Sequence, residues 1–146
     1  FPHLNVTLVD SLQKRLTFLE EVIKKLDLNG VETVHARAEE FARIESEREK
    51  YDIACSRAVA RLNILAEYCI PFVKLGGQFV AMKGSAAEEE LEAATNAYKI
   101  LGCEKPTIIC ENLRENEARA FIVSKKKSQT PPKYPRMGGK IAKSAL

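Results

Sequence analysis

The sequence predicts an α/β fold with a mostly parallel sheet that ends in an antiparallel hairpin. Strand-like and helix-like segments alternate from residue 5 to residue 101, which is typical of a parallel sheet with helices on both faces. Two further strand-like segments then follow with only a short polar connection, which favours antiparallel pairing. The 146 residues, 45% apolar and 29% charged, are enough for one globular core.

The first two elements follow from β-branched content and helical spacing. Residues 5–10, NVTLVD, alternate in polarity and predict a strand that ends at Asp10. Ser11 is expected to cap the next helix, and Gly30 in LNG is expected to be its C-cap. Apolar residues on that helix recur at spacings of three and four: Leu12, Leu16, Leu19, Ile23 and Leu26.

The middle of the chain continues the alternation. Residues 31–36, VETVHA, predict a second strand, and a polar segment that is a short helix or a loop follows it. Residues 51–56, YDIACS, predict a third strand. A helix is expected over residues 58–74, with Pro71 shortening or kinking its end.

The last elements are marked by glycine and by a capping pattern. LGG at 75–77 predicts a turn before a fourth strand, QFVAMKG at 78–84. The SAAE sequence that begins at Ser85 predicts a capping box and a helix that ends near Leu101. The hairpin strands are expected over the segments 106–113 and 119–127, joined by RENEA.

Composition excludes some classes of protein. The four cysteines form no C-x-x-C pair, which predicts buried, reduced thiols in a cytoplasmic protein. The two histidines lack ligand spacing, so no metal site is expected. No apolar run reaches the roughly 18 residues of a membrane span, so no membrane partner is expected. Residues 124–143 carry several cations and no acid, which indicates either a nucleic-acid contact or a solvated tail.

Three side chains at the ends of predicted strands, where ligands of doubly wound sheets bind, are candidates. Asp10 is placed to accept hydrogen bonds from ribose hydroxyls, or it is an ordinary acid in the first turn of a helix. Arg57 leaves an apolar strand, which favours a ligand contact over a salt bridge to Glu39 or Asp10. Lys83 ends the next strand, and two such cations suit an anionic partner.

Other candidates are weaker by themselves. Arg37 and Glu39 follow the second strand, where a surface charge and a first-turn acid are equally good explanations. Arg119 opens the last strand, where a charge that protects a sheet edge is an adequate explanation. No G-x-G-x-x-G follows a strand, so either the protein binds no nucleotide or that loop precedes Phe1.

Several linked motifs nevertheless occur together in one order. They are FPHLNVTLVDSLQKRLTFLEEV, HARAEEF, YDIACSRAVARL, GGQFVAMKGS and KYPR. In this combination the chain resembles the bacterial RsmG family, also called glucose-inhibited division protein B. The resemblance implies a Rossmann-like S-adenosylmethionine methyltransferase fold that here lacks its first strand and Gly-rich loop. It also implies methylation of a guanine N7 in 16S ribosomal RNA, within the RNA or a 30S-related particle, by a cytoplasmic monomer.

The resemblance also assigns residues. The cofactor side comprises Asp10 and Ser11 near the ribose, Ala38 and Glu39 near the adenine, and Arg57 as a positioning residue. The basic residues expected to face the RNA are Arg37, Lys83, Arg119 and Arg136. Residues 1–127 are then an incomplete methyltransferase domain, and residues 128–146 are a basic C-terminal tail that departs from the family after KYPR.

Two other functions stay open on the sequence alone. An NAD-dependent enzyme of similar fold would also use Asp10 for a ribose. A non-catalytic RNA-binding or ribosome-assembly module would use the basic tail instead. Without the loop that holds the methionine part, the isolated chain is expected to bind S-adenosylmethionine weakly or not at all.

Overall fold

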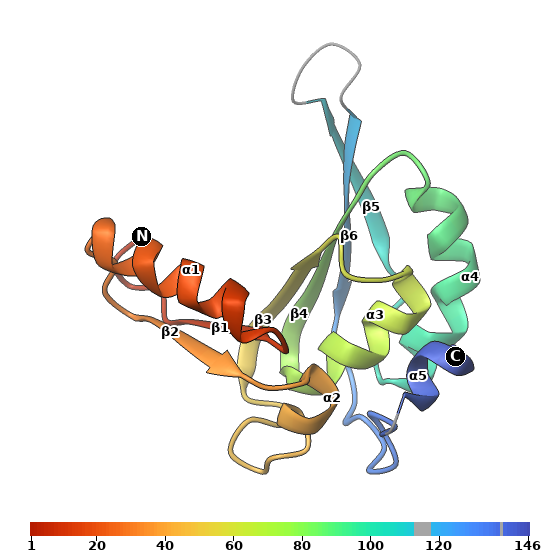
Figure 1. Ribbon diagram of the computed structural model, residues 1–146. Coiled ribbons are helices and arrows are strands. Elements are labelled where there is room, and N and C mark those ends of the chain that lie inside the picture. The colour runs from red at the N-terminus through yellow and green to blue at the C-terminus, as the bar shows by residue number, and fades with distance from the viewer. Residues whose placement is uncertain (113–117, 138) are drawn as a thin grey trace. The chain divides into compact units, whose positions relative to one another are not determined.

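A computed structural model of the protein describes residues 1–112, 118–137 and 139–146 (Figure 1). The chain divides into two compact units, Phe1–Phe41 and Ala42–Leu146. No helix in these described ranges is long and apolar enough to cross a bilayer.

The first unit contains two parallel strands joined by a helix. Its elements are β1 (Val6–Asp10), α1 (Gln13–Lys25), β2 (Val31–His35) and the short α2 (Ala38–Phe41). β1 and β2 pair in parallel, with Asp10 opposite His35 at their carboxyl ends. The residues that follow the two strands therefore meet at one edge of this sheet, as the sequence predicts for a ligand crevice.

Both expected caps of α1 are wrong. The N-cap residue is Leu12 and not Ser11, and the carboxylate of Asp10 accepts the Leu12 N–H at 2.8 Å. The helix ends at Lys25, whereas Gly30 lies in the turn before β2 with φ near +75°. A Cβ at Gly30 would lie 2.9 Å from a backbone oxygen, so this turn requires glycine.

The second unit is a four-stranded sheet with helices. The strands are β3 (Tyr51–Arg57), β4 (Val73–Lys83), β5 (Thr107–Asn112) and β6 (Ala118–Lys125), in the order β3-β4-β6-β5. β3 and β4 are parallel, and β6 is antiparallel to both β4 and β5. The predicted terminal hairpin is confirmed, although its connection falls on 113–117, outside the described residues.

The helices of this unit are α3 (Leu62–Cys69), the 3₁₀ turn η1 (Ile70–Phe72), α4 (Ala87–Ile100) and α5 (Lys140–Lys143). α3 and α4 lie against the same face of the sheet (Figure 1). Leu62, Phe79 and Ile122 are fully buried between them and the strands. The opposite face exposes Ile53 and Ile109, and no helix among the described residues of this unit covers it.

Two boundaries differ from the sequence prediction around β4. The helix expected over 58–74 begins only at Leu62, and Ala58, at the expected start, has φ near +55°, which an α-helix does not allow. β4 begins at Val73 and continues through the predicted turn at 75–77. Gly77 is needed there because a Cβ would lie 2.6 Å from a backbone oxygen of the neighbouring strand.

The expected capping box is also absent at the start of α4. The helix begins at Ala87, and its N-cap residue is Ala86 rather than Ser85. No side chain caps that end. Three glutamates, including Glu90, lie in the first turn, where their negative charges interact favourably with the helix dipole.

The C-terminal segment packs into the second unit and is not a solvated tail. Thr130, Tyr134 and Ile141 are buried, and Arg48 donates hydrogen bonds to the carbonyl oxygens of Thr130 and Tyr134 at 2.8 Å each. Because these buried backbone groups are paired, the segment has a fixed place. The segment thus belongs to the second compact unit, which begins at Ala42.

Candidate active site

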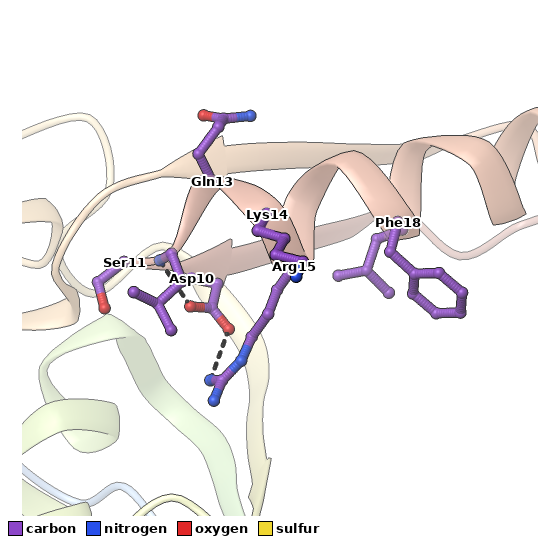
Figure 2. Close-up of a pocket in the computed structure, with 8 residues that line it drawn as sticks. Asp10, Ser11, Gln13, Lys14, Arg15 and Phe18 are labelled. Carbon is purple, nitrogen blue, oxygen red and sulfur yellow. Dashed lines mark hydrogen bonds and ion pairs between the residues drawn. The ribbon is translucent and has the colours of Figure 1, made fainter.

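A groove of about 820 Å³ runs beside Asp10 in the first unit (Figure 2). Its lining residues are Asp10, Ser11, Leu12, Gln13, Lys14, Arg15, Phe18 and Leu19. Leu12 and Phe18 expose 52% and 67% of their surfaces, so one side of the groove is apolar. The groove thus combines an apolar wall with one carboxylate, which suits a ligand that carries both a flat apolar group and hydroxyls.

The Asp10 carboxylate is held by two donors. Its Oδ1 accepts the N–H of Leu12 at 2.8 Å, and its Oδ2 accepts the Arg15 guanidinium at 3.2 Å, as Figure 2 shows. Partial burial raises the pKa of Asp10, but the Leu12 and Arg15 hydrogen bonds lower it more, so the pKa lies below its usual value. The group is therefore ionised at neutral pH, with lone pairs left for two hydroxyls.

The Arg15→Met variant is expected to raise the pKa of Asp10, because it removes both a hydrogen bond and a nearby positive charge. A carboxyl ¹³C NMR titration of the 146-residue chain measures this shift. Lys14→Met is the matched control, since Lys14 is the preceding cation of the same helix and makes no ion pair within the described residues. Equal titration curves for Arg15→Met and the parent would contradict this account.

The residues expected near the adenine follow the neighbouring strand. Glu39 is 6% exposed and pairs with Arg37 at 3.5 Å, while the Arg37 side chain remains 64% exposed. Ala38 begins α2 beside them. The carbonyl oxygen of Ser11 lies 3.1 Å from Nε2 of His35, the residue opposite Asp10. The first unit therefore brings the predicted ribose and adenine residues to one sheet edge.

Arg15 and His35 were not anticipated from the sequence. Arg15 reads as one of several charges on the outer face of a helix, and nothing in the pattern distinguishes it. His35 gains its place only from the register that sets it opposite Asp10. Arg15 reaches Asp10 only because both lie where β1 passes into the first turn of α1.

Arg57 is the last residue of β3, and its side chain is exposed. Within the described residues of the second unit its guanidinium makes no hydrogen bond or ion pair. The two carboxylates considered as its partners, Asp10 and Glu39, are each paired inside the first unit. The following residue, Ala58, has φ near +55°, a conformation that costs a non-glycine residue energy and often marks a functional position.

Lys83 ends β4, and its neighbour Met82 pairs with Arg57 across the sheet. Its ammonium group donates to the carbonyl oxygen of Ala60 at 2.6 Å and to Glu90 at 2.7 Å, and its side chain is 10% exposed. Lys83 was predicted to face the RNA, and the structure gives it internal acceptors. A contact between Lys83 and RNA would therefore use an ammonium group that is already paired with the Glu90 carboxylate.

The other two predicted RNA contacts differ from each other. Arg119 lies on β6 with an exposed side chain. Arg136 instead binds the fully buried Glu67 through its backbone N–H at 2.7 Å and its guanidinium at 2.6 Å. The hydrogen bond with Glu67 raises the pKa of Arg136, as expected for a cation held by a carboxylate.

The cysteines are not uniformly buried. Cys55 and Cys110 are exposed, which corrects the prediction of buried thiols, whereas Cys69 and Cys103 are partly buried. Burial raises the pKa of Cys69 to about 12 and that of Cys103 to about 11, so these two thiols are protonated and unreactive at neutral pH. Within the described ranges, no three His, Cys, Asp or Glu side chains gather as metal ligands.

Sequence comparison places the chain among known proteins. The family profile described as GidB, rRNA small subunit methyltransferase G, matches residues 1–120. A ribosomal RNA small subunit methyltransferase G from Acetivibrio thermocellus is 53% identical over the whole chain and 60% of the relative. One from Desulfitobacterium hafniense is 53% identical over 99% of the chain and 61% of the relative. The chain thus spans about 60% of the length of these relatives.

Solved structures show the fold. An rRNA methylase from Streptococcus thermophilus superposes with a TM-score of 0.61 at 13% identity, covering 85% of this chain and 74% of that one. A 16S rRNA (adenine(1408)-N(1))-methyltransferase from Catenulisporales acidiphilia superposes with a TM-score of 0.67 at 11% identity, covering 86% of this chain and 74% of that one. The predicted Rossmann-like methyltransferase fold is therefore confirmed. With the family profile matching most of its length, the chain belongs to the rRNA small subunit methyltransferase G family.

Proposed function

We propose that this chain supplies the adenosine side of an S-adenosylmethionine site and the substrate-facing strand ends of a 16S rRNA (guanine-N7) methyltransferase. The observation that carries the proposal is the ionised Asp10 carboxylate, fixed at the end of β1 beside a groove with an apolar wall. A carboxylate in that position can accept hydrogen bonds from both hydroxyls of a ribose. Family membership supports the same assignment.

The residues proposed to contact the adenosine all lie in the first unit. We assign Asp10 and Ser11, which line the groove, to the ribose, and Ala38 and Glu39, at the start of α2, to the adenine. Glu39 is buried and held by Arg37, so its carboxylate is oriented before any ligand arrives. S-adenosylmethionine, when bound, supplies an electrophilic methyl group.

Guanine N7 needs little acid–base help from the protein. Its lone pair lies in the plane of the base, so no side chain has to remove a proton before attack. The protein's contribution is then alignment and exclusion of water. We assign alignment to Arg57, whose exposed guanidinium can bind guanine O6 or a phosphate. Arg37 and Arg119 are the proposed RNA contacts that remain exposed.

The direct test uses a chimaera of this chain with the part of the Acetivibrio thermocellus relative that it does not span. Tritiated S-adenosylmethionine and 30S particles are the substrates, and borohydride–aniline cleavage of the 16S RNA reports methylation at guanine N7. We expect label in the RNA and one cleavage site. Label without aniline cleavage would reject the N7 assignment, and binding of the particles without label would favour the non-catalytic RNA-binding module.

Asp10→Asn is expected to weaken binding of S-adenosylhomocysteine to the chimaera by about 10- to 100-fold, because it replaces a charged acceptor with a neutral one. Isothermal titration calorimetry measures the change. Asp52→Asn is the control, since Asp52 is 80% exposed and pairs only with Lys74 within the described residues. Unchanged affinity in Asp10→Asn would remove Asp10 from the ribose site.

A further inference from the structure

The segment between Arg57 and α3 is held by a pair of charged residues that reach it from another strand and another helix. Lys83, at the end of β4, donates to the Ala60 carbonyl oxygen at 2.6 Å and to Oε2 of Glu90 at 2.7 Å. The same Oε2 accepts the backbone N–H of Leu62, the first residue of α3, at 2.7 Å. These four groups are called the Lys83–Glu90 clasp.

Each hydrogen bond of the clasp pairs a backbone group or a charge that lacks a local partner. The N-cap residue of α3, Arg61, makes no side-chain cap hydrogen bond, so the first N–H groups of the helix lack a local acceptor. Glu90 of α4 supplies an acceptor for the Leu62 N–H, and its negative charge also interacts favourably with the dipole at the N-terminus of α3. Lys83, 10% exposed, neutralises Glu90 and satisfies the Ala60 carbonyl, so both backbone groups and both charges are paired.

The clasp is anchored close to Arg57. Arg57 pairs with Met82 in the parallel register, and Met82 is the residue before Lys83. Between Arg57 and the clasped Ala60 lie only Ala58, at φ near +55°, and Val59, which is 65% exposed. Two ends of this short segment are therefore fixed, one by the sheet and one by the clasp, so the backbone that carries Arg57 is constrained.

We infer that Lys83 and Glu90 are positioning residues, which hold the segment that carries Arg57 and present its guanidinium to the RNA base. This inference rests on the proposed function, and it gives Lys83 a role other than direct RNA contact. Glu90 gains a role that its place among three glutamates of a helix does not suggest. A misplacement of about 1 Å at a positioning segment is enough to slow a reaction roughly 10- to 100-fold.

The kinetic test uses the chimaera with Lys83→Met, Glu90→Ala and the double variant. We expect kcat to fall about 10- to 100-fold in each single variant with little change in the KM for RNA, and no further fall in the double variant. Glu90→Gln, which keeps an acceptor for the Leu62 N–H, should recover part of the loss. Glu89→Ala is the control, because Glu89 precedes Glu90 on α4 and is exposed.

Direct RNA contact by Lys83 predicts the opposite behaviour. Glu90→Ala would then free the ammonium and tighten RNA binding, and Lys83→Met would lower the slope of binding affinity against salt by about one. Either result would overturn the inference. So would a double variant whose fall in kcat is the product of the falls in the two single variants.

Amide hydrogen exchange of the 146-residue chain separates this inference from the proposed function. The Leu62 amide should exchange faster in Glu90→Ala than in the parent or in Glu89→Ala. Unchanged exchange at Leu62 would refute the clasp whatever the chimaera's activity. Faster exchange together with a parent chimaera that transfers no methyl group would instead reject the proposed function, and with it the role of the clasp in that reaction.

Discussion

Replacing Glu49 with alanine is expected to lower the free energy of unfolding by about 3–5 kcal/mol, because it leaves a buried ammonium group without its carboxylate. The Lys126 side chain is fully buried, and its ammonium lies 3.0 Å from Glu49. Glu49 also accepts the backbone N–H of Thr130 at 2.7 Å. The variant therefore removes a charge partner and the acceptor of a buried N–H together.

Urea unfolding of the 146-residue chain, followed by circular dichroism, measures the loss. Glu49→Gln should cost less, since its amide oxygen still accepts the Thr130 N–H. Glu45→Ala is the control, because Glu45 is exposed in the same segment. A loss below about 1 kcal/mol in Glu49→Ala would mean that Lys126 reaches water and that the pair contributes no more than a surface ion pair.

The same pair predicts a pH dependence. Burial lowers the pKa of Lys126 below its usual value, and the hydrogen bond to Glu49 opposes that shift. Between the folded pKa and the unfolded value of 10.5, the unfolded chain binds more protons, so this group makes stability rise with pH. Without Glu49 the pKa of Lys126 in the folded chain falls further, so the pH range over which stability rises becomes wider. The difference in stability between Glu49→Ala and the parent should consequently become smaller from pH 7 to pH 9.5, as measured by thermal unfolding scans.

This pair also shows where sequence reasoning fails. Glu49 and Lys126 each lie in strongly charged segments, EREK and SKKK, and such runs are usually solvated. Nothing in either run identifies the one member that is buried, because the pairing depends on a contact between distant parts of the chain. The basic C-terminal segment was accordingly expected to be a tail, although Arg48, Glu49 and Glu67 fix it.

Strand ends were easier to predict than strand partners. The apolar pattern of YDIACS placed the end of β3 within one residue of Arg57, and the rule for doubly wound sheets singled out Asp10 beside its groove. The same pattern does not say which strands are neighbours. The alternation suggested one sheet, whereas the described strands form two, β1-β2 and β3-β4-β6-β5. Gly76 and Gly77 read as a turn because the close backbone approach that requires Gly77 is a tertiary feature.

Arg57→Ala is expected to lower kcat of the chimaera on 30S particles by about 100-fold, since a bidentate arginine contact to a guanine is worth roughly 1–3 kcal/mol. The structure supports this because the Arg57 guanidinium makes no ion pair within the described residues of the second unit. Its removal therefore breaks no internal bond, and stability should change by less than about 0.5 kcal/mol, as at an ordinary surface site.

Arg57→Lys and Arg61→Ala distinguish the possible roles. Lysine keeps the charge but not the planar pair of donors, so Arg57→Lys should recover little of the activity if the contact is bidentate. Arg61→Ala removes the next cation of the same exposed segment and should leave kcat within about twofold, as the removal of a charge at the rim of a contact surface does. A weaker Kd for S-adenosylhomocysteine in Arg57→Ala would place Arg57 against the cofactor instead of the guanine. Wild-type kcat and KM in that variant would remove Arg57 from the site and leave its position at the end of β3 without a functional explanation.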